Sequence, residues 1–183
     1  FTLNHTLSTS VEGSLLVEDV GQGPCVVPPS RVAERLNRQF PMDRTRQYFT
    51  FVYGVFDGLQ GRFDYVLAGH PAPILLPRTG PPAPLHGRGL PIGMIENATF
   101  DDETVILQPG DRLYFYTDGV VEALDASEQE FGALRLMAEV DTGRNAVDGT
   151  RELVLIPAVG EAERVVTMTF DSATQLSGLD VYS

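Results

Sequence analysis

The chain has 183 residues, a length typical of one globular domain, and 43% of them are hydrophobic. Its formal net charge is −12 and its 13 basic residues are all arginine, which argues against the broad positive surface of a nucleic-acid-binding protein. No apolar run approaches the roughly 20 residues of a membrane-spanning helix, so we expect a soluble protein without a membrane span.

The single cysteine, Cys25, excludes an internal disulfide framework and fits a reducing compartment. No basic and apolar leader opens the chain, so we expect a cytoplasmic location. The sequence begins at Phe1, without an initiator methionine, and its first ten residues are typical of the interior of a longer chain. The acidic composition permits cation binding, although such a composition more often reflects a solvated surface.

The first predicted element with clear boundaries is an amphipathic helix over residues 30–40, and residues 1–10 are compatible with the end of another helix. Ser30 is the predicted N-cap of the 30–40 helix, and Pro41 stops it. Its apolar positions recur every four residues, at Val32, Leu36 and Phe40. This spacing predicts a helix with one buried face.

Two segments rich in aromatic and β-branched residues follow, at residues 48–57 and 62–69. They flank the turn-like sequence DGLQG, which predicts an antiparallel hairpin with its turn at residues 57–61. Residues 74–76 form the next predicted strand. The tract PRTGPPAPLHGRGLPIG, residues 77–93, is so rich in proline and glycine that it predicts a long loop, and long loops in compact domains often serve a function.

Strands and helices alternate in the second half of the chain. A second hairpin is predicted for residues 104–107 and 112–116, around a turn at 108–111. The remaining predicted elements are two helices, 119–123 and 131–140, and two strands, 151–159 and 164–170. Antiparallel strand pairs with helices between and after them predict an α+β fold.

The sequence PGDRLYFYTDGVVEA, residues 109–123, places Asp118 and Gly119 directly after a predicted buried strand. A carboxylate in that position is held by rigid backbone, and the glycine lets a ligand approach closely. Mg²⁺ and Mn²⁺ prefer such oxygen ligands. Two interpretations stay open from these residues alone: Asp118 caps the following helix, or it binds a cation. Glu122, four residues on, either shares the cation-facing side of that helix or is an ordinary surface residue.

His70 is a second candidate, in the sequence AGHPAP, where it follows Gly69 at the end of a predicted strand. A histidine there is a ligand, a general acid or a hydrogen-bonding strut, and the strut is the commonest of the three. The carboxylate run Asp101–Glu103 is more typical of a solvated turn than of a metal site. No Walker-type or GxGxxG spacing follows a strand, which argues against nucleotide binding by those motifs.

Six segments occur in order along the chain: VAERLNRQFPMD (32–43), QYFTFVYGVFD (47–57), FDYVLAGHPAPILL (63–76), GLPIGM (89–94), LQPGDRLYFYTDGVVEA (107–123) and EFGALRLM (130–137). In sequence and in spacing they resemble the SpoIIE-like branch of the PPM metal-dependent serine/threonine phosphatases, which includes the RsbU-type regulators. The resemblance covers residues 30–140. We expect residues 1–183 to form a single domain of this kind, with a divergent tail at 141–183.

The resemblance implies a fold, a reaction and a partner. The fold is an α+β sandwich of antiparallel sheets flanked by helices, here expected to be incomplete at its N-terminus. The reaction is hydrolysis of phosphoserine or phosphothreonine by a water that two Mn²⁺ or Mg²⁺ ions activate. The implied partner is a phosphorylated regulatory protein of the anti-sigma-factor antagonist type in a bacterial signalling pathway.

The resemblance also assigns residues to roles. Asp118 and Gly119 match a metal-binding position of the family, whereas His70 and Gly69 match a motif with a structural role near the edge of the active site. The family's other metal-binding motifs, an early GGD-type segment, a DVSGHG-type segment and a late DD-I/V-T motif, have no good match in the expected places. The weaker candidates for the missing ligands are Asp19, Asp171 and Asp180.

Two alternatives follow from this incomplete ligand set. The chain is the core of an active phosphatase, or it is a pseudophosphatase or truncated domain that serves as a protein-binding or dimerisation module. Missing N-terminal strands would leave exposed sheet edges, which favour association with another chain, so we expect the chain alone to be oligomeric, for example as a homodimer, or to be poorly stable.

Overall fold

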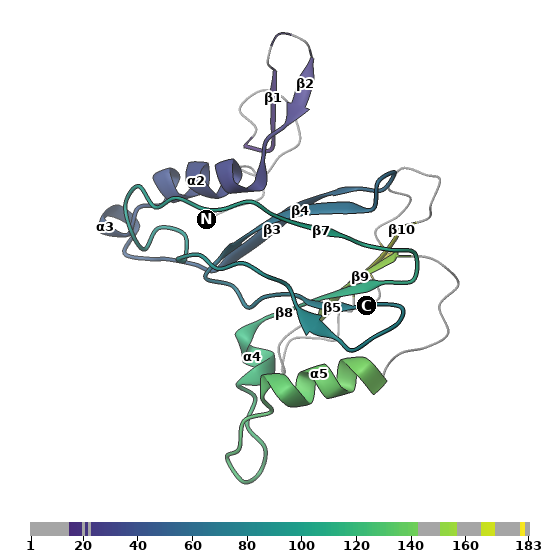
Figure 1. The fold of residues 1–183 in the computed structure, drawn as a ribbon. Helices are drawn as coiled ribbons and strands as arrows, with labels where there is room; N and C mark the ends of the chain where they lie inside the picture. The colour runs from purple at the N-terminus through teal and green to yellow at the C-terminus, as the bar shows by residue number, and fades with distance from the viewer. Residues whose placement is uncertain are drawn as a thin grey trace. The chain divides into compact units, whose positions relative to one another are not determined.

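A computed structural model describes residues 15–19, 21, 23–142, 151–156, 166–170 and 180–181 (Figure 1). The chain divides into two compact units, and each consists of several segments. Unit 1 comprises Phe1–Val55, Asp64–His70 and Gly87–Thr104, and unit 2 comprises Phe56–Phe63, Pro71–His86 and Val105–Ser183. That these units belong to one functional domain stays a prediction, and the helix expected within residues 1–10 lies outside the described residues.

The first elements of the chain are a hairpin and two helices. Strands β1 (Val17–Asp19) and β2 (Pro24–Val26) pair antiparallel, and the helices are α2 (Pro29–Gln39) and α3 (Met42–Thr45). The helix predicted for residues 30–40 is thus confirmed to within one residue at each end. Its predicted N-cap is wrong, because Pro28 occupies the cap position, and Ser30 lies inside the first turn. Proline at the first helical position, as at Pro29, suits a helix start because its missing N–H would have no intrahelical partner.

Helix α2 buries its apolar face in the core of unit 1. The fully buried positions include Val32, Ala33 and Leu36, and they pack with Val66 and Ile92 from later segments. Burying side chains of this size contributes about 1.5–3 kcal/mol each. The predicted apolar stripe is therefore the one that the structure buries.

A three-stranded sheet has the order β3–β4–β7, from strands β3 (Phe51–Asp57), β4 (Arg62–Ala68) and β7 (Glu103–Ile106). The hairpin predicted from residues 48–57 and 62–69 is confirmed by β3 and β4. Asp57 closes its turn, since the carboxylate accepts hydrogen bonds from the backbone N–H of Leu59 (2.9 Å) and Gln60 (3.1 Å).

A larger sheet has the order β11–β10–β9–β8–β5–β6. Figure 1 labels β5, β8, β9 and β10 among its strands. Its strands are β5 (Ile74–Leu76), β6 (Ala83–Pro84), β8 (Arg112–Tyr116), β9 (Arg151–Ile156), β10 (Val166–Phe170) and β11 (Asp180–Val181). Neighbouring strands of this sheet run antiparallel, except β8 and β9, which run parallel with Tyr116 opposite Ile156. The α+β class is therefore confirmed, with one parallel pair that the sequence did not predict.

The expected hairpin of residues 104–107 and 112–116 is wrong. Strand β7 joins β4, whereas β8 pairs with β5 and β9 in the other sheet. Asp111 explains the separation, because it is 5% exposed and its carboxylate accepts the N–H of Gln108 (2.8 Å) and of Arg78 (2.7 Å). The turn before β8 is thereby fixed to the segment that follows β5.

Two helices cover part of unit 2, α4 (Asp118–Val121) and α5 (Ala133–Thr142). They confirm the helices predicted at 119–123 and 131–140. Leu136 and Val140 of α5 pack with Ile74 of β5 and with Tyr114 and Tyr116 of β8 in the core of this unit. None of the described helices combines the length and apolar character that crossing a bilayer would require.

Candidate metal-binding site

Asp118 lies at the end of a rigid, mostly buried strand. In β8, Leu113 is fully buried and Tyr114 and Tyr116 are each 9% exposed, and hydrogen-bonded neighbours flank the strand on both sides. The chain leaves the sheet at Thr117 in an extended conformation, and Asp118 is the first residue of α4. Both Thr117 and Asp118 are exposed. The carboxylate is therefore presented to solvent from a fixed backbone.

The carboxylate of Asp118 is not the N-cap of α4, because Thr117 holds that position. Its Oδ1 accepts the N–H of the adjacent Gly119 at 2.9 Å, and within the described part of the chain no other side-chain hydrogen bond of Asp118 is found. A negative charge in the first turn of a helix is also favoured by the helix dipole. Asp118 is therefore not the N-cap that one interpretation from the sequence assigned to it, and its assignment as a cation ligand stays a prediction.

Glu122 lies one helical turn after Asp118. Its backbone N–H donates to the carbonyl of Asp118 (2.9 Å), and its side chain is exposed. Residues four apart lie on the same side of a helix, so the two acidic side chains project from neighbouring positions. The position of Glu122 is compatible with either interpretation made from the sequence.

The other candidate aspartates lie in other elements or outside the described residues. In the β1–β2 hairpin, the Oδ1 atom of Asp19 accepts the N–H of Gly21 (2.8 Å), which makes Asp19 a turn residue. Asp180 lies in β11 opposite Thr167, three strands along the sheet from β8. Asp171 lies outside the described residues. Across the residues that the structure describes, no three His, Cys, Asp or Glu side chains form a group able to hold a metal ion.

His70 and Gly69 lie at the end of β4, in unit 1. The Nδ1 atom of His70 lies 3.3 Å from Oγ1 of Thr50, a hydrogen bond between neighbouring segments. Gly69 has φ +70° and donates its N–H to the carbonyl of Gly89 (2.9 Å). A Cβ at Gly69 would lie 2.5 Å from Pro91, so no larger residue fits. These contacts favour the structural role that the sequence predicted for this motif.

After Asp118 the chain forms a loop in which the acidic side chain of Asp125 is hydrogen-bonded to the backbone of the loop itself. The carboxylate of Asp125 accepts the N–H groups of Ser127 (2.7 Å) and Gln129 (3.1 Å). These hydrogen bonds, that of Gln129 first, hold the pKa of Asp125 below its ordinary value. On the buried side of the same region, desolvation raises the pKa of the Tyr116 phenol. Asp125 therefore serves the loop, and Tyr116 stays neutral at physiological pH.

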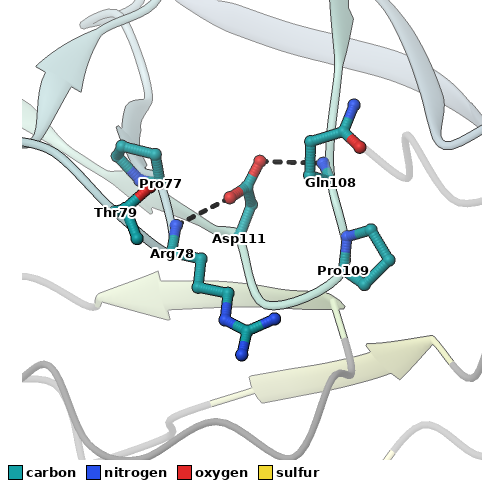
Figure 2. A pocket seen from close by; sticks show the side chains of 6 residues that line it. All are labelled: Pro77, Arg78, Thr79, Gln108, Pro109 and Asp111. Carbon is teal, nitrogen blue, oxygen red and sulfur yellow. Dashed lines mark hydrogen bonds between the residues drawn. The ribbon is translucent and has the colours of Figure 1, made fainter.

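A pocket of about 470 Å³ in unit 2 lies between the segment after β5 and the turn before β8 (Figure 2). Asp111 lies in its wall, and both carboxylate oxygens already accept backbone N–H groups. The side chains of Arg78 and Gln108 point away from each other (Figure 2). Ligand sites usually have a few polar groups that converge on one point, and this pocket has no such set among its lining residues.

Sequence reasoning missed three polar residues that hold the motifs together. Asn37, on α2, is 2% exposed; its amide nitrogen donates to the carbonyl of Ile95 (3.0 Å), and its oxygen accepts the N–H of Gly93 (2.7 Å). Asn37 thus joins the LNRQF helix to the GLPIGM loop. An asparagine among the apolar positions of a helix is the signal that could have identified it.

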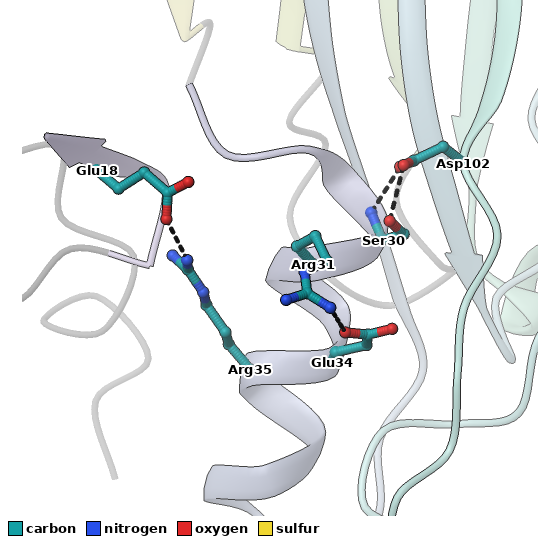
Figure 3. A network of polar contacts seen from close by, with 6 residues as sticks. All are labelled: Glu18, Ser30, Arg31, Glu34, Arg35 and Asp102. Carbon is teal, nitrogen blue, oxygen red and sulfur yellow. Dashed lines mark hydrogen bonds and ion pairs between the residues drawn. The ribbon is translucent and has the colours of Figure 1, made fainter. Parts of the chain in front are cut away.

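The other two missed residues are Asp102 and Asp111. Asp102 accepts the backbone N–H and the hydroxyl of Ser30, each at 2.7 Å (Figure 3). It therefore satisfies donors in the first turn of α2 that Ser30 had been expected to cap itself. Because 72 residues separate the two partners, no local pattern could have revealed the contact.

Comparison with known proteins adds three findings. Residues 10–155 match the family model described as stage II sporulation protein E (SpoIIE). The chain is 28% identical over 130 residues to "Protein IcfG" of Synechocystis sp., covering 71% of this chain and 20% of that protein. It is 33% identical over 125 residues to "Phosphoserine phosphatase RsbP" of Bacillus subtilis, covering 66% of this chain and 30% of that protein.

A solved structure is also similar, that of the RsbU and RsbW domains of Rv1364c from Mycobacterium tuberculosis. The sequence identity is 26% and the TM-score is 0.45, over 60% of this chain and 29% of that one. The chain thus spans between a fifth and a third of the length of each of these relatives.

Proposed function

The chain belongs to the SpoIIE family, whose model matches residues 10–155, and from that membership we propose that it is the phosphatase domain of a bacterial signalling regulator. The substrate class is a phosphoserine or phosphothreonine side chain of another protein. A relative named as a phosphoserine phosphatase supports this assignment. The observation that carries it is the exposed Asp118, presented by a buried strand within the segment that matches the family.

Asp118 is the residue to which we assign contact with Mn²⁺ or Mg²⁺, with Gly119 leaving room for the ion. An exposed carboxylate with one hydrogen-bond donor, its own neighbour, fits a single ligand position of a hard cation. A dinuclear centre needs several carboxylates, and the described residues do not supply them in one place. The described part of the chain therefore fits one ligand of such a centre and not the whole centre.

The proposed partner is a phosphorylated regulatory protein of the anti-sigma-factor antagonist type, and the proposed location is the cytoplasm. Association of two copies of the chain belongs to the same proposal. The second candidate function is that of an inactive module that binds a partner without turnover. The observation in its favour is that, among the described residues, no three His, Cys, Asp or Glu side chains form a group able to hold a metal ion.

The two functions are separated by an assay of phosphate release from a phosphoserine peptide, with and without Mn²⁺. Asp118→Asn removes the charge while keeping the size of the side chain, and Glu139→Gln is the matched control on the exposed face of α5. We expect Mn²⁺-dependent release by the native chain and by Glu139→Gln, and a loss of about 100-fold or more in Asp118→Asn. Mn²⁺ binding without release of phosphate would favour the inactive module.

A further inference from the structure

Positive charge is concentrated in one short segment of unit 1. Residues 31–46 contain five of the 13 arginines and two acidic residues, a formal charge of +3. The other residues of the chain together carry −15, since the total is −12. The segment is therefore opposite in sign to the rest of the protein.

Two of the five arginines are engaged within the protein (Figure 3). Arg31 forms an ion pair with Glu34, one turn further along α2, at 2.8 Å. Arg35 forms an ion pair with Glu18 of β1 and also reaches the carbonyl of Leu15 (3.4 Å). The charges of these two residues serve contacts of α2 with itself and with the N-terminal hairpin.

The other three arginines, Arg38, Arg44 and Arg46, are exposed. Within the part of the chain that the structure describes, ion pairs are found for Arg31 and Arg35, and neither an ion pair nor a side-chain hydrogen bond is found for the other three. Each guanidinium group offers five N–H donors in a planar fork that matches a carboxylate. These three side chains are therefore available to an acidic ligand.

Contacts within unit 1 hold both ends of the segment that carries Arg44 and Arg46. Phe40, before it, is buried, and its ring lies 5.9 Å from the ring of Phe49, after it, in an edge-to-face contact. The backbone of Phe49 exchanges two hydrogen bonds with Ile92. The chain between Phe40 and Phe49 thus leaves the core and returns to it at one place, which restricts the freedom of the arginines it carries.

Two exposed hydrophobic residues lie between Phe40 and Phe49. Met42 is 42% exposed and Tyr48 is 52% exposed, whereas the backbone N–H of Met42 is held by the carbonyl of Gly93 (2.9 Å). Arginine, tyrosine and methionine are the residue types enriched in protein interfaces. Asp43 is also exposed, and it lies in the first turn of α3, where a negative charge favours the helix start.

We propose that Arg38, Met42, Arg44, Arg46 and Tyr48, the basic surface, dock an acidic segment of a partner protein. Carboxylates of that segment pair with the arginines, and an apolar residue of it contacts the methionine and the tyrosine. Charge complementarity selects this occupant, because the arginines lack acidic partners among the described residues. A nucleic acid is disfavoured by the −15 outside the segment.

The test measures the affinity of a fluorescein-labelled peptide of repeating Glu-Glu-Leu by fluorescence anisotropy. The variant R38Q/R44Q/R46Q is compared with R62Q/R88Q/R135Q, which removes the same charge from exposed arginines outside the segment. We expect the first variant to bind about tenfold more weakly, and the second to bind within about twofold of the native chain. Equal weakening by both variants would overturn the proposal.

Further variants separate docking from simple charge attraction. M42A/Y48A leaves the charge unchanged and is expected to weaken binding about threefold or more, so an unchanged affinity would count against the proposal. Asp118→Asn is expected to bind the peptide as the native chain does, which keeps this test independent of the proposed phosphatase activity. Tighter binding of duplex DNA or of phosphatidylserine vesicles, or self-association lost in R38Q/R44Q/R46Q, would also overturn it.

Discussion

Replacing Asn37 by alanine is expected to destabilise unit 1 through the loop at Gly93. The substitution leaves the buried N–H of Gly93 without its acceptor, at a cost of about 1–3 kcal/mol, and removes a hydrogen bond to Ile95 that is worth about 0.5–1.5 kcal/mol. The carbonyl of Ile95 still accepts the N–H of Ala98 at 3.3 Å in the variant, so losing its hydrogen bond to Asn37 is expected to cost an amount near the lower limit of that range. Alanine favours a helix by roughly 0.5 kcal/mol over asparagine.

The net loss expected for Asn37→Ala is about 2 kcal/mol, or a fall in Tm of about 4–8 °C for a chain of this length. Urea denaturation measures the loss, with Gln39→Ala as the control, since Gln39 is exposed near the end of the same helix. Hydrogen exchange provides a local measure, in which the amide of Gly93 is expected to lose protection. A stability of Asn37→Ala within about 0.5 kcal/mol of the native value would refute the role assigned to this side chain.

Three further predictions concern packing, turn geometry and pH. A Cβ at Gly89 would lie 2.2 Å from the carbonyl oxygen of Leu67, so Gly89→Ala is expected to cost about 2 kcal/mol or more in urea denaturation, whereas Gly58→Ala, with no atom closer than 3.9 Å, is expected to be neutral or slightly stabilising. Asp111→Ala removes the acceptor of two backbone N–H groups and is expected to cost about 2–4 kcal/mol by the same measurement; a neutral result would contradict the account of the turn before β8. Burial, assisted by the charge of Glu103, raises the pKa of Tyr65 to about 12 from 10.0, so its contribution to stability is complete below pH 10 and is lost as the pH rises toward 12. The denaturation midpoint should therefore fall over that interval, and less so in Tyr65→Phe; parallel pH profiles of the two proteins would contradict this.

The sequence predicted what local patterns determine. The spacing of Val32 and Leu36 identified the buried face of α2, and the aromatic and β-branched residues of β3 and β4 identified their hairpin. The prediction that Asp118 follows the end of a strand is confirmed. An apolar run followed by Asp-Gly predicts a strand end whichever strands lie beside it.

Contacts between distant segments could not be predicted in the same way. The parallel pairing of β8 with β9 joins Tyr116 to Ile156, and nothing in either strand specifies its neighbour. The predicted hairpin before β8 was wrong because a Pro-Gly turn between two strands is typical of a hairpin, whereas the carboxylate of Asp111 fixes this turn to Arg78 instead. The first turn of α2 likewise depends on Asp102, which lies far along the chain.

For the candidate site, the assignment of Asp118 as a ligand stays a prediction, and the sequence did not identify a complete set of ligands. Asp19 was a weaker candidate from the sequence, and in the structure its carboxylate closes the β1–β2 turn through Gly21. Asp180 lies on an outer strand of the sheet that contains β8. Whether a carboxylate closes a turn or remains available to bind a cation depends on the conformation of the backbone around it. A sequence motif does not specify that conformation.

The proposal that Asp118 is a ligand of a divalent cation is tested by adding Mn²⁺ to the isotopically labelled chain and recording the backbone amide resonances. A paramagnetic ion at Asp118 broadens the resonances nearest to it. We expect the broadening to be strongest around Asp118, at Gly119, whose N–H lies 2.9 Å from the Asp118 carboxylate, and at Thr117, with the effect lost in Asp118→Asn and kept in Glu139→Gln. Broadening centred on another part of the chain, or equal broadening in Asp118→Asn, would contradict the assignment.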